Sequence, residues 1–150
     1  MSTFFVDTSS LAKRYVNEVG STWMRSWTLP AAGNVIVISD LTTVEMSSLL
    51  ARRVREGTLA AAVESILSST FFLNVEHEYL SIALDTSVLA SAQLLVRKHA
   101  LRALDGLQLA SALKAVSLLK ESMTFVCGDG KLSAAAAAEG FLTDDPNLHP

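Results

Sequence analysis

The sequence predicts an α/β fold, a three-layer α/β/α sandwich whose central sheet is mainly parallel and has about five strands. Two observations indicate this fold. Short apolar runs, rich in β-branched and aromatic residues, alternate along the chain with longer segments of helical spacing. One of these runs, residues 35–38, is β-branched throughout, as is typical of a strand covered on both faces. Because strands that alternate with helices are joined by parallel crossovers, helices should cover both faces of the sheet.

Each apolar run and each helical segment is assigned to an element in chain order. The runs expected to form strands are residues 3–6, 35–38, 71–75, 124–127 and 141–143. The segments expected to form helices are residues 9–19, 22–29, 41–56, 58–68, 78–99, 104–119 and 131–139. Helix ends are indicated by Gly20, Gly57 and Gly140, and by Pro30 after the second helix. No linker or repeat divides the chain, so residues 1–150 are expected to form a single domain.

The composition excludes several classes of protein. With 50% hydrophobic and 18% charged residues, the chain is too apolar for a disordered protein. No apolar run approaches the roughly 20 residues of a membrane span, so we expect a soluble, cytoplasmic protein with no membrane partner. The single cysteine, Cys127, excludes an internal disulfide and fits a reducing compartment. A formal charge of −3 provides no general attraction to nucleic acid.

Four acidic residues are expected at one edge of the sheet. Asp7 ends the first strand, and Asp129 follows the strand at residues 124–127. Glu45 lies in the first turns of the helix after the second strand, and Asp105 stands at a helix start, where an anion is favoured. In a parallel sheet these places share the carboxyl-end edge, where open α/β sheets bind ligands. We therefore expect the four side chains to converge.

Electrostatic repulsion limits what such a cluster can be. Two unit charges ~6 Å apart repel by roughly 3 kcal/mol at an effective dielectric constant of about 20. Four carboxylates make six pairs, so full ionisation would cost on the order of 10–15 kcal/mol, comparable to the stability of a whole domain. The cluster must hold protons, pair with cationic side chains or bind metal. An all-oxygen site suits Mg²⁺ or Mn²⁺ rather than zinc.

An acidic Mg²⁺ or Mn²⁺ site in a cleft is typical of enzymes that cut phosphodiester bonds. The metal lowers the pKa of a bound water and stabilises the charge of the transition state. Thr8 or Ser9 could orient a carboxylate or the scissile phosphate. The basic residues that could contact the rest of an RNA backbone are Lys13, Arg14, Arg52, Arg53 and Arg55.

Four segments of the chain resemble the conserved blocks of PIN-domain ribonucleases, and in particular the VapC-type toxins of toxin–antitoxin pairs. They read FFVDTSSLAKRYVNE, TTVEMSSLLARR, LRALDGLQLASALKA and FVCGDGKLSAAAAAEGF, and together they cover nearly the whole chain in order. The resemblance implies a PIN-like fold and a Mg²⁺-dependent endoribonuclease that forms a homodimer and is inhibited by a cognate antitoxin. It also implies that the metal-binding acids are Asp7, Glu45, Asp105 and Asp129. One departure is Cys127-Gly128 before Asp129, where the family more often has Thr or Ser.

Two other functions stay open from the residues alone. In a phospho-accepting receiver-like domain Asp7 would be phosphorylated, but such sites have a second acid beside the first, and the neighbours here are Val6, Thr8 and Ser9. In a non-catalytic binding module the fold would persist without the chemistry. Trp23 and Trp27 are expected in the core or at a dimer contact, or lining an antitoxin groove. The residues expected to play no part in the site are Asp85, Asp144, Asp145, Cys127, His77, His99 and His149.

Overall fold

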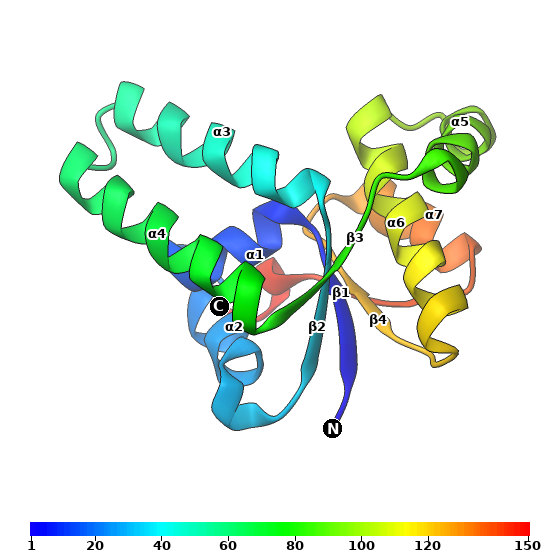
Figure 1. Cartoon of the computed structure of the whole chain (residues 1–150), viewed down its shortest axis with the longest axis horizontal. Coiled ribbons are helices and arrows are strands. Elements are labelled where there is room, and N and C mark those ends of the chain that lie inside the picture. The colour runs from blue at the N-terminus through cyan, green and yellow to red at the C-terminus, as the bar shows by residue number, and fades with distance from the viewer.

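The five strands of the structure, a computed structural model that describes residues 1–150, form one parallel sheet. The strands are β1 (Thr3–Val6), β2 (Val35–Ser39), β3 (Tyr79–Ile82), β4 (Thr124–Val126) and β5 (Leu142–Asp144). Their order across the sheet is β3-β2-β1-β4-β5, and each neighbouring pair is parallel. The predicted number of strands is therefore confirmed, and the sheet is entirely rather than mainly parallel. Because every neighbouring pair is parallel, all five strands end at the same edge of the sheet, toward which β1, β2 and β3 run upward in Figure 1.

Helices cover both faces of this sheet, which confirms the predicted three-layer sandwich. Figure 1 shows one group on the left and the other on the right. The first group is α1 (Thr8–Tyr15), α2 (Ser21–Thr28), α3 (Leu41–Arg55) and α4 (Ala61–His77). The second group is α5 (Thr86–His99), α6 (Ala103–Leu119) and α7 (Gly130–Ala138). Two short 3₁₀ turns, Pro30–Ala32 and Pro146–Leu148, complete the chain, and no helix is long and apolar enough to cross a membrane.

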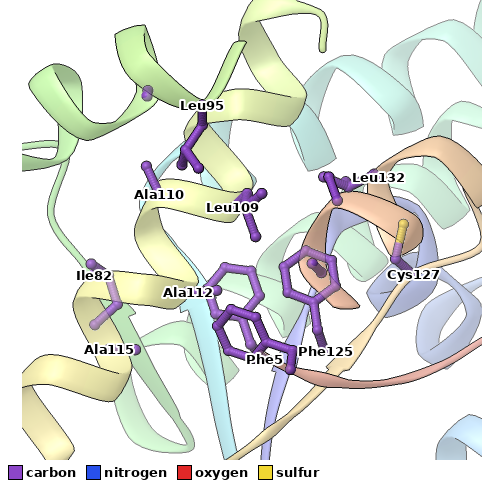
Figure 2. Packing of buried hydrophobic residues seen from close by; sticks show 14 of the residues in the cluster. Phe5, Ile82, Leu95, Leu109, Ala110, Ala112, Ala115, Phe125, Cys127 and Leu132 are labelled. Atoms are coloured by element: carbon purple, nitrogen blue, oxygen red, sulfur yellow. The ribbon is translucent and has the colours of Figure 1, made fainter. Parts of the chain in front are cut away.

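Each face of the sheet contributes to its own hydrophobic core. Between the sheet and α5–α7, Phe5 and Phe125 stack with their ring centroids 5.3 Å apart, and Leu109 of α6 packs with them (Figure 2). On the opposite face, Val6, Ile38 and other strand residues pack against α1–α4. Alternate residues of β1 thus enter opposite cores, which explains why the strand is apolar throughout.

The predicted strand at residues 71–75 is wrong. These residues lie inside α4, and the strand that pairs with β2 is β3, which the prediction had placed within a helix over residues 78–99. A five-residue apolar run fits either a strand or one face of a buried helix, so its periodicity could not decide. In the helix, Phe71 and Asn74 are buried, whereas Phe72 and Leu73 are exposed. This helical spacing of buried residues is recognisable only when the whole of α4 is considered.

The segment between α1 and α2 also differs from the prediction. Helix α1 ends at Tyr15 rather than at residue 19, because residues 16–20 turn back and the Lys13 ammonium donates to the Val19 carbonyl at 2.8 Å. Gly20 therefore precedes α2 instead of ending α1. It has φ +88°, and a Cβ there would lie 2.3 Å from the Pro146 carbonyl oxygen, so only glycine fits.

Candidate functional site

A cavity of about 520 Å³ opens at the carboxyl-end edge of the sheet, between the first turns of α1, α3 and α6 and the start of α7. All four predicted acids line it, although they come from four separate parts of the chain. Thr8 and Ser9, predicted to support the acids, line it as well. The remaining lining residues are Leu41, Val44, Ser48, Leu49, Arg52, Arg102, Leu104 and Gln108.

Asp7 lines the cavity and is the N-cap of α1. One of its carboxylate oxygens accepts from the Ser10 backbone N–H at 2.9 Å, and the other accepts from the Ser9 hydroxyl at 3.1 Å. The residue is 7% exposed. Burial raises the pKa of Asp7 above its ordinary value, although hydrogen bonds from Ser10, Cys127 and Ser9 act in the opposite direction. A nearby cation would be needed to hold this carboxylate ionised without that penalty.

Glu45 is held by side chains from two other helices. Its Oε1 accepts from the Thr8 hydroxyl at 2.8 Å and from the Gln108 amide nitrogen at 2.7 Å. Thr42, one turn before Glu45 on α3, lies 3.1 Å from the Thr8 hydroxyl and 3.2 Å from the Gln108 amide nitrogen. The structure therefore supports the predicted role of Thr8 as a residue that orients a carboxylate.

Asp105 and Asp129 face one another across an arginine. The Arg102 guanidinium lies 3.4 Å from an oxygen of Asp105 and 4.0 Å from an oxygen of Asp129. The other oxygen of Asp129 caps α7 and accepts from the backbone N–H groups of Lys131 and Leu132, each at 3.0 Å. Asp129 thus has one oxygen committed to the helix and one turned toward Arg102.

These contacts show how the protein's own groups limit the predicted repulsion. The pKa of Asp7 is raised, Glu45 accepts two hydrogen bonds, and the Arg102 guanidinium pairs with Asp105 and Asp129. In this arrangement no three acidic, histidine or cysteine side chains lie close enough together to hold one metal ion. The side chains that line the cavity nonetheless offer carboxylate and hydroxyl oxygens, which suit Mg²⁺ or Mn²⁺. The donor chemistry fits such an ion, and the carboxylates and Arg102 would have to adjust around it.

The basic residues predicted to contact RNA have different surroundings. Arg52 lines the cavity, whereas Arg53 pairs with Glu18 and Arg55 is exposed at the end of α3. The other two, Lys13 and Arg14, are held within the protein and do not line the cavity.

Lys13 is 6% exposed and donates to Glu18, to the Val19 carbonyl and to Asn147. Arg14 has a side chain only 8% exposed, which donates to Glu78 and to the Tyr79 hydroxyl, each at 2.8 Å. Both side chains therefore tie segments of the fold together, and this placement gives no support to their predicted contact with RNA.

The sequence-based prediction did not include three residues at the site. Gln108 and Arg102 line the cavity, and Thr42 is fully buried within hydrogen-bond distance of Thr8 and Gln108. Gln108 follows Asp105 by three positions on α6, and Thr42 precedes Glu45 by three positions on α3, so each lies on the same helix face as a predicted acid. That spacing is the signal that could have found them. Arg102 precedes α6 and is the N-cap position of that helix.

The residues predicted to play no part in the site do not line the cavity. The Cys127 thiol is fully buried, and burial together with the neighbouring Asp7 carboxylate raises its pKa, which disfavours the thiolate form. Trp27 is in the core, as expected, while Trp23 stacks on His149 with centroids 4.0 Å apart. The possible role of the two tryptophans in an antitoxin groove stays a prediction.

Three solved structures share the fold of this chain. FitAcB from Neisseria gonorrhoeae matches with a TM-score of 0.64 and 15% identity, over 95% of this chain and 97% of that one. PAE2754 from Pyrobaculum aerophilum matches with a TM-score of 0.63 and 17% identity, over 95% and 89% of the two chains. VapBC2 from Rickettsia felis, solved bound to a DNA fragment from their promoter, matches with a TM-score of 0.63 and 13% identity, over 95% and 98%.

No family model matches the sequence, and neither does any curated protein. The likeness to the three structures extends over almost the whole length of each chain, so it concerns the complete fold rather than one motif. The α/β/α fold expected from the resemblance to PIN domains is therefore confirmed.

Proposed function

We propose that this protein is a Mg²⁺- or Mn²⁺-dependent endoribonuclease, the VapC-type PIN toxin of a toxin–antitoxin pair. One observation carries the proposal: Asp7, Glu45, Asp105 and Asp129, which are separated by as many as 122 positions in sequence (129 − 7), line one cavity at the carboxyl-end edge of a parallel sheet. That edge is where open α/β sheets bind ligands. The cavity holds no other acidic side chain and no histidine.

The chain's own residues divide the work of binding and positioning. The cation, when bound by the four carboxylates, would activate a water for attack on phosphorus and stabilise charge in the transition state. Asp7 and Glu45 are fixed by hydrogen bonds from Ser10, Thr8 and Gln108, so they supply rigid ligands. Asp105 and Asp129 are held only by the exposed Arg102 and by the α7 cap, which leaves them freer to adjust.

Two arginines at the cavity would hold the RNA backbone. Arg52 of α3 and Arg102 before α6 are lining residues that come from different helical layers of the sandwich. Each can donate to phosphate oxygens in a fork, as arginine does in many phosphate sites. A substrate phosphate between them would lie above the carboxylates, and its own negative charge would favour cation binding at the same place.

The proposed partners follow from the resemblance and from the neighbours. VapBC2 is named as a pair and was solved on DNA from their promoter, which supports an antitoxin as a partner here. We further propose a homodimer, as the resemblance implies. An antitoxin segment that supplies a cationic side chain to the cavity would find Asp105 and Asp129 near its mouth, where Arg102 pairs with them.

The test is cleavage of a mixed single-stranded RNA pool by the purified protein, followed by sequencing of the 5′ ends. We expect cleavage that needs added Mg²⁺ or Mn²⁺, stops with a chelator and falls by about 100-fold or more in Asp7→Asn or Glu45→Gln, since a metal ligand supports several kcal/mol of transition-state stabilisation. Asp85→Asn is the matched control, because Asp85 also caps a helix but lies outside the cavity. Mn²⁺ binding without cleavage of any RNA would instead favour the non-catalytic module, and phosphorylation of Asp7 would favour the receiver-like alternative.

A further inference from the structure

Gln108 is an unusually placed amide. It lies on α6, is only 2% exposed, and is surrounded by polar side chains of α1 and α3. Its Nε2 donates to Glu45 Oε1 at 2.7 Å and lies 3.2 Å from both the Thr8 and the Thr42 hydroxyl oxygens. One amide therefore connects three helices at the wall of the cavity that the acids line.

The hydrogen bonds of Thr8, Thr42 and Gln108 all lead toward Glu45 Oε1. The Thr8 hydroxyl has a single proton, and its shortest contact is to Glu45 Oε1 at 2.8 Å. The Thr42 hydroxyl can then donate to the Thr8 oxygen, 3.1 Å away. Gln108 gives one amide proton to Glu45 and the other to the threonine oxygens. Every donor in the group thus leads, directly or through one hydroxyl, to the same carboxylate oxygen.

The amide orientation is fixed by the same contacts. Turning the amide over would set its oxygen against the Glu45 carboxylate, so the nitrogen must face Glu45. In this orientation Gln108 Oε1 is buried and has no hydrogen-bond partner. An unpaired buried amide oxygen destabilises a fold. An apolar side chain of similar size would avoid that cost, so packing alone does not account for a glutamine here.

We propose that Gln108 is a positioning residue for the cation site, and that it acts through Glu45. Together with Thr8, it holds Oε1 of the carboxylate and leaves Oε2, which has no protein partner, free for the cation in the cavity. Without Gln108 the carboxylate keeps one hydrogen bond from Thr8 and can rotate. This inference rests on the proposed function, since it assigns a role toward the proposed Mg²⁺ or Mn²⁺.

The experiment is calorimetric titration of the full chain with MnCl₂, without RNA. Gln108→Met removes the donor at nearly constant volume, and we expect it to weaken Mn²⁺ binding by roughly 10- to 100-fold, the usual effect of losing a group that orients a metal ligand. Gln93→Met is the matched control, because Gln93 is the other glutamine of the chain and is exposed on α5. It should bind Mn²⁺ as the wild type does.

A double variant distinguishes positioning of Glu45 by Gln108 from a general effect of the substitution on the fold. In Glu45→Ala, which has no carboxylate to orient, adding Gln108→Met should cause no further loss of Mn²⁺ affinity. An equal additional loss in that background, or wild-type affinity in Gln108→Met alone, would overturn the inference. If Gln108→Met fails to fold, Thr42→Val tests the same network, and an unchanged Mn²⁺ affinity there would count against it. A wild type that binds no Mn²⁺ would refute the proposed function itself.

Discussion

Arg102 provides the sharpest test of the cavity's electrostatics, because its removal should improve metal binding whereas removal of any of the acids should weaken it. Its guanidinium lies 3.4 Å from Asp105 and 4.0 Å from Asp129, and a cation that uses these carboxylates must displace it or bind beside it. We therefore expect Arg102→Ala to bind Mn²⁺ more tightly than the wild type does.

The distances set the size of the effect. The Arg102 side chain is 84% exposed, so the dielectric constant of water is the appropriate one. In water, unit charges at these two distances attract by about 1.2 and about 1.0 kcal/mol, and measured exposed pairs contribute about 0.2–1 kcal/mol each. The sum is about 0.5–2 kcal/mol, which corresponds to an affinity gain of roughly 2- to 30-fold. Because salt screens exposed charges, the gain should shrink when the ionic strength rises toward about 1 M.

The assay is calorimetric titration with MnCl₂ at low and high salt. Arg55→Ala is the control, since Arg55 is exposed at the far end of α3, lies outside the cavity and changes the net charge equally. In RNA cleavage, by contrast, Arg102→Ala should weaken RNA binding and raise the KM for RNA, because a phosphate contact is lost. Weaker Mn²⁺ binding in Arg102→Ala, or a gain that Arg55→Ala reproduces, would refute this account of the cavity.

Three further predictions concern stability. Without metal, Asp7→Asn should melt at a higher temperature than the wild type at pH 7, and the difference should fade as the pH drops toward 4. Burial raises the pKa of Asp7, so above the ordinary value of 3.8 the folded wild type binds more protons than its unfolded chain and loses stability as the pH rises. The substitution keeps the helix cap, because asparagine caps a helix as well as aspartate does. A difference that is independent of pH in thermal melts would contradict this. Gly106→Ala should lower the free energy of unfolding by about 1–3 kcal/mol in urea titrations, because its Cβ would lie 2.3 Å from Val96 Cγ1 at the α5–α6 contact. Gly130→Ala is the control: a Cβ at Gly130 would meet open space, so the free energy of unfolding should change by less than about 0.5 kcal/mol. Arg14→Leu should lower the free energy of unfolding by about 2–4 kcal/mol, because it removes the cationic partner of Glu78 and one of the two hydrogen-bond partners of the Tyr79 hydroxyl. The KM for RNA should stay unchanged, and a raised KM in the folded variant would restore Arg14 as an RNA contact.

The arrangement of the acids was predictable because it follows from chain order alone. Asp7 comes directly after β1, Asp129 comes three positions after the end of β4, and Glu45 and Asp105 lie near helix starts. A parallel topology therefore brings the four acids to one edge. The same local signals predicted α3, α6 and α7 to within two residues at each end.

The third strand was not predictable in the same way. The sequence at residues 71–75 is more apolar than that of β3, yet it forms part of α4. Strand β3 pairs only with β2 and is therefore an edge strand, with its middle residues exposed. An edge strand needs fewer apolar residues than a central one, so composition favoured the wrong segment.

What the sequence by itself determined is the parallel sheet apart from its edge strand β3, the two helical layers that cover it and the edge at which four acids meet. What only the tertiary structure decided is the immediate environment of each charged group. Lys13 is held by Asn147, 134 positions away, and Arg14 by Glu78, 64 positions away, whereas Glu45 is held by Gln108, 63 positions away. Periodicity and caps are properties of neighbouring residues, but burial and hydrogen-bond partners depend on which distant segments pack together, and these set the role of a charge.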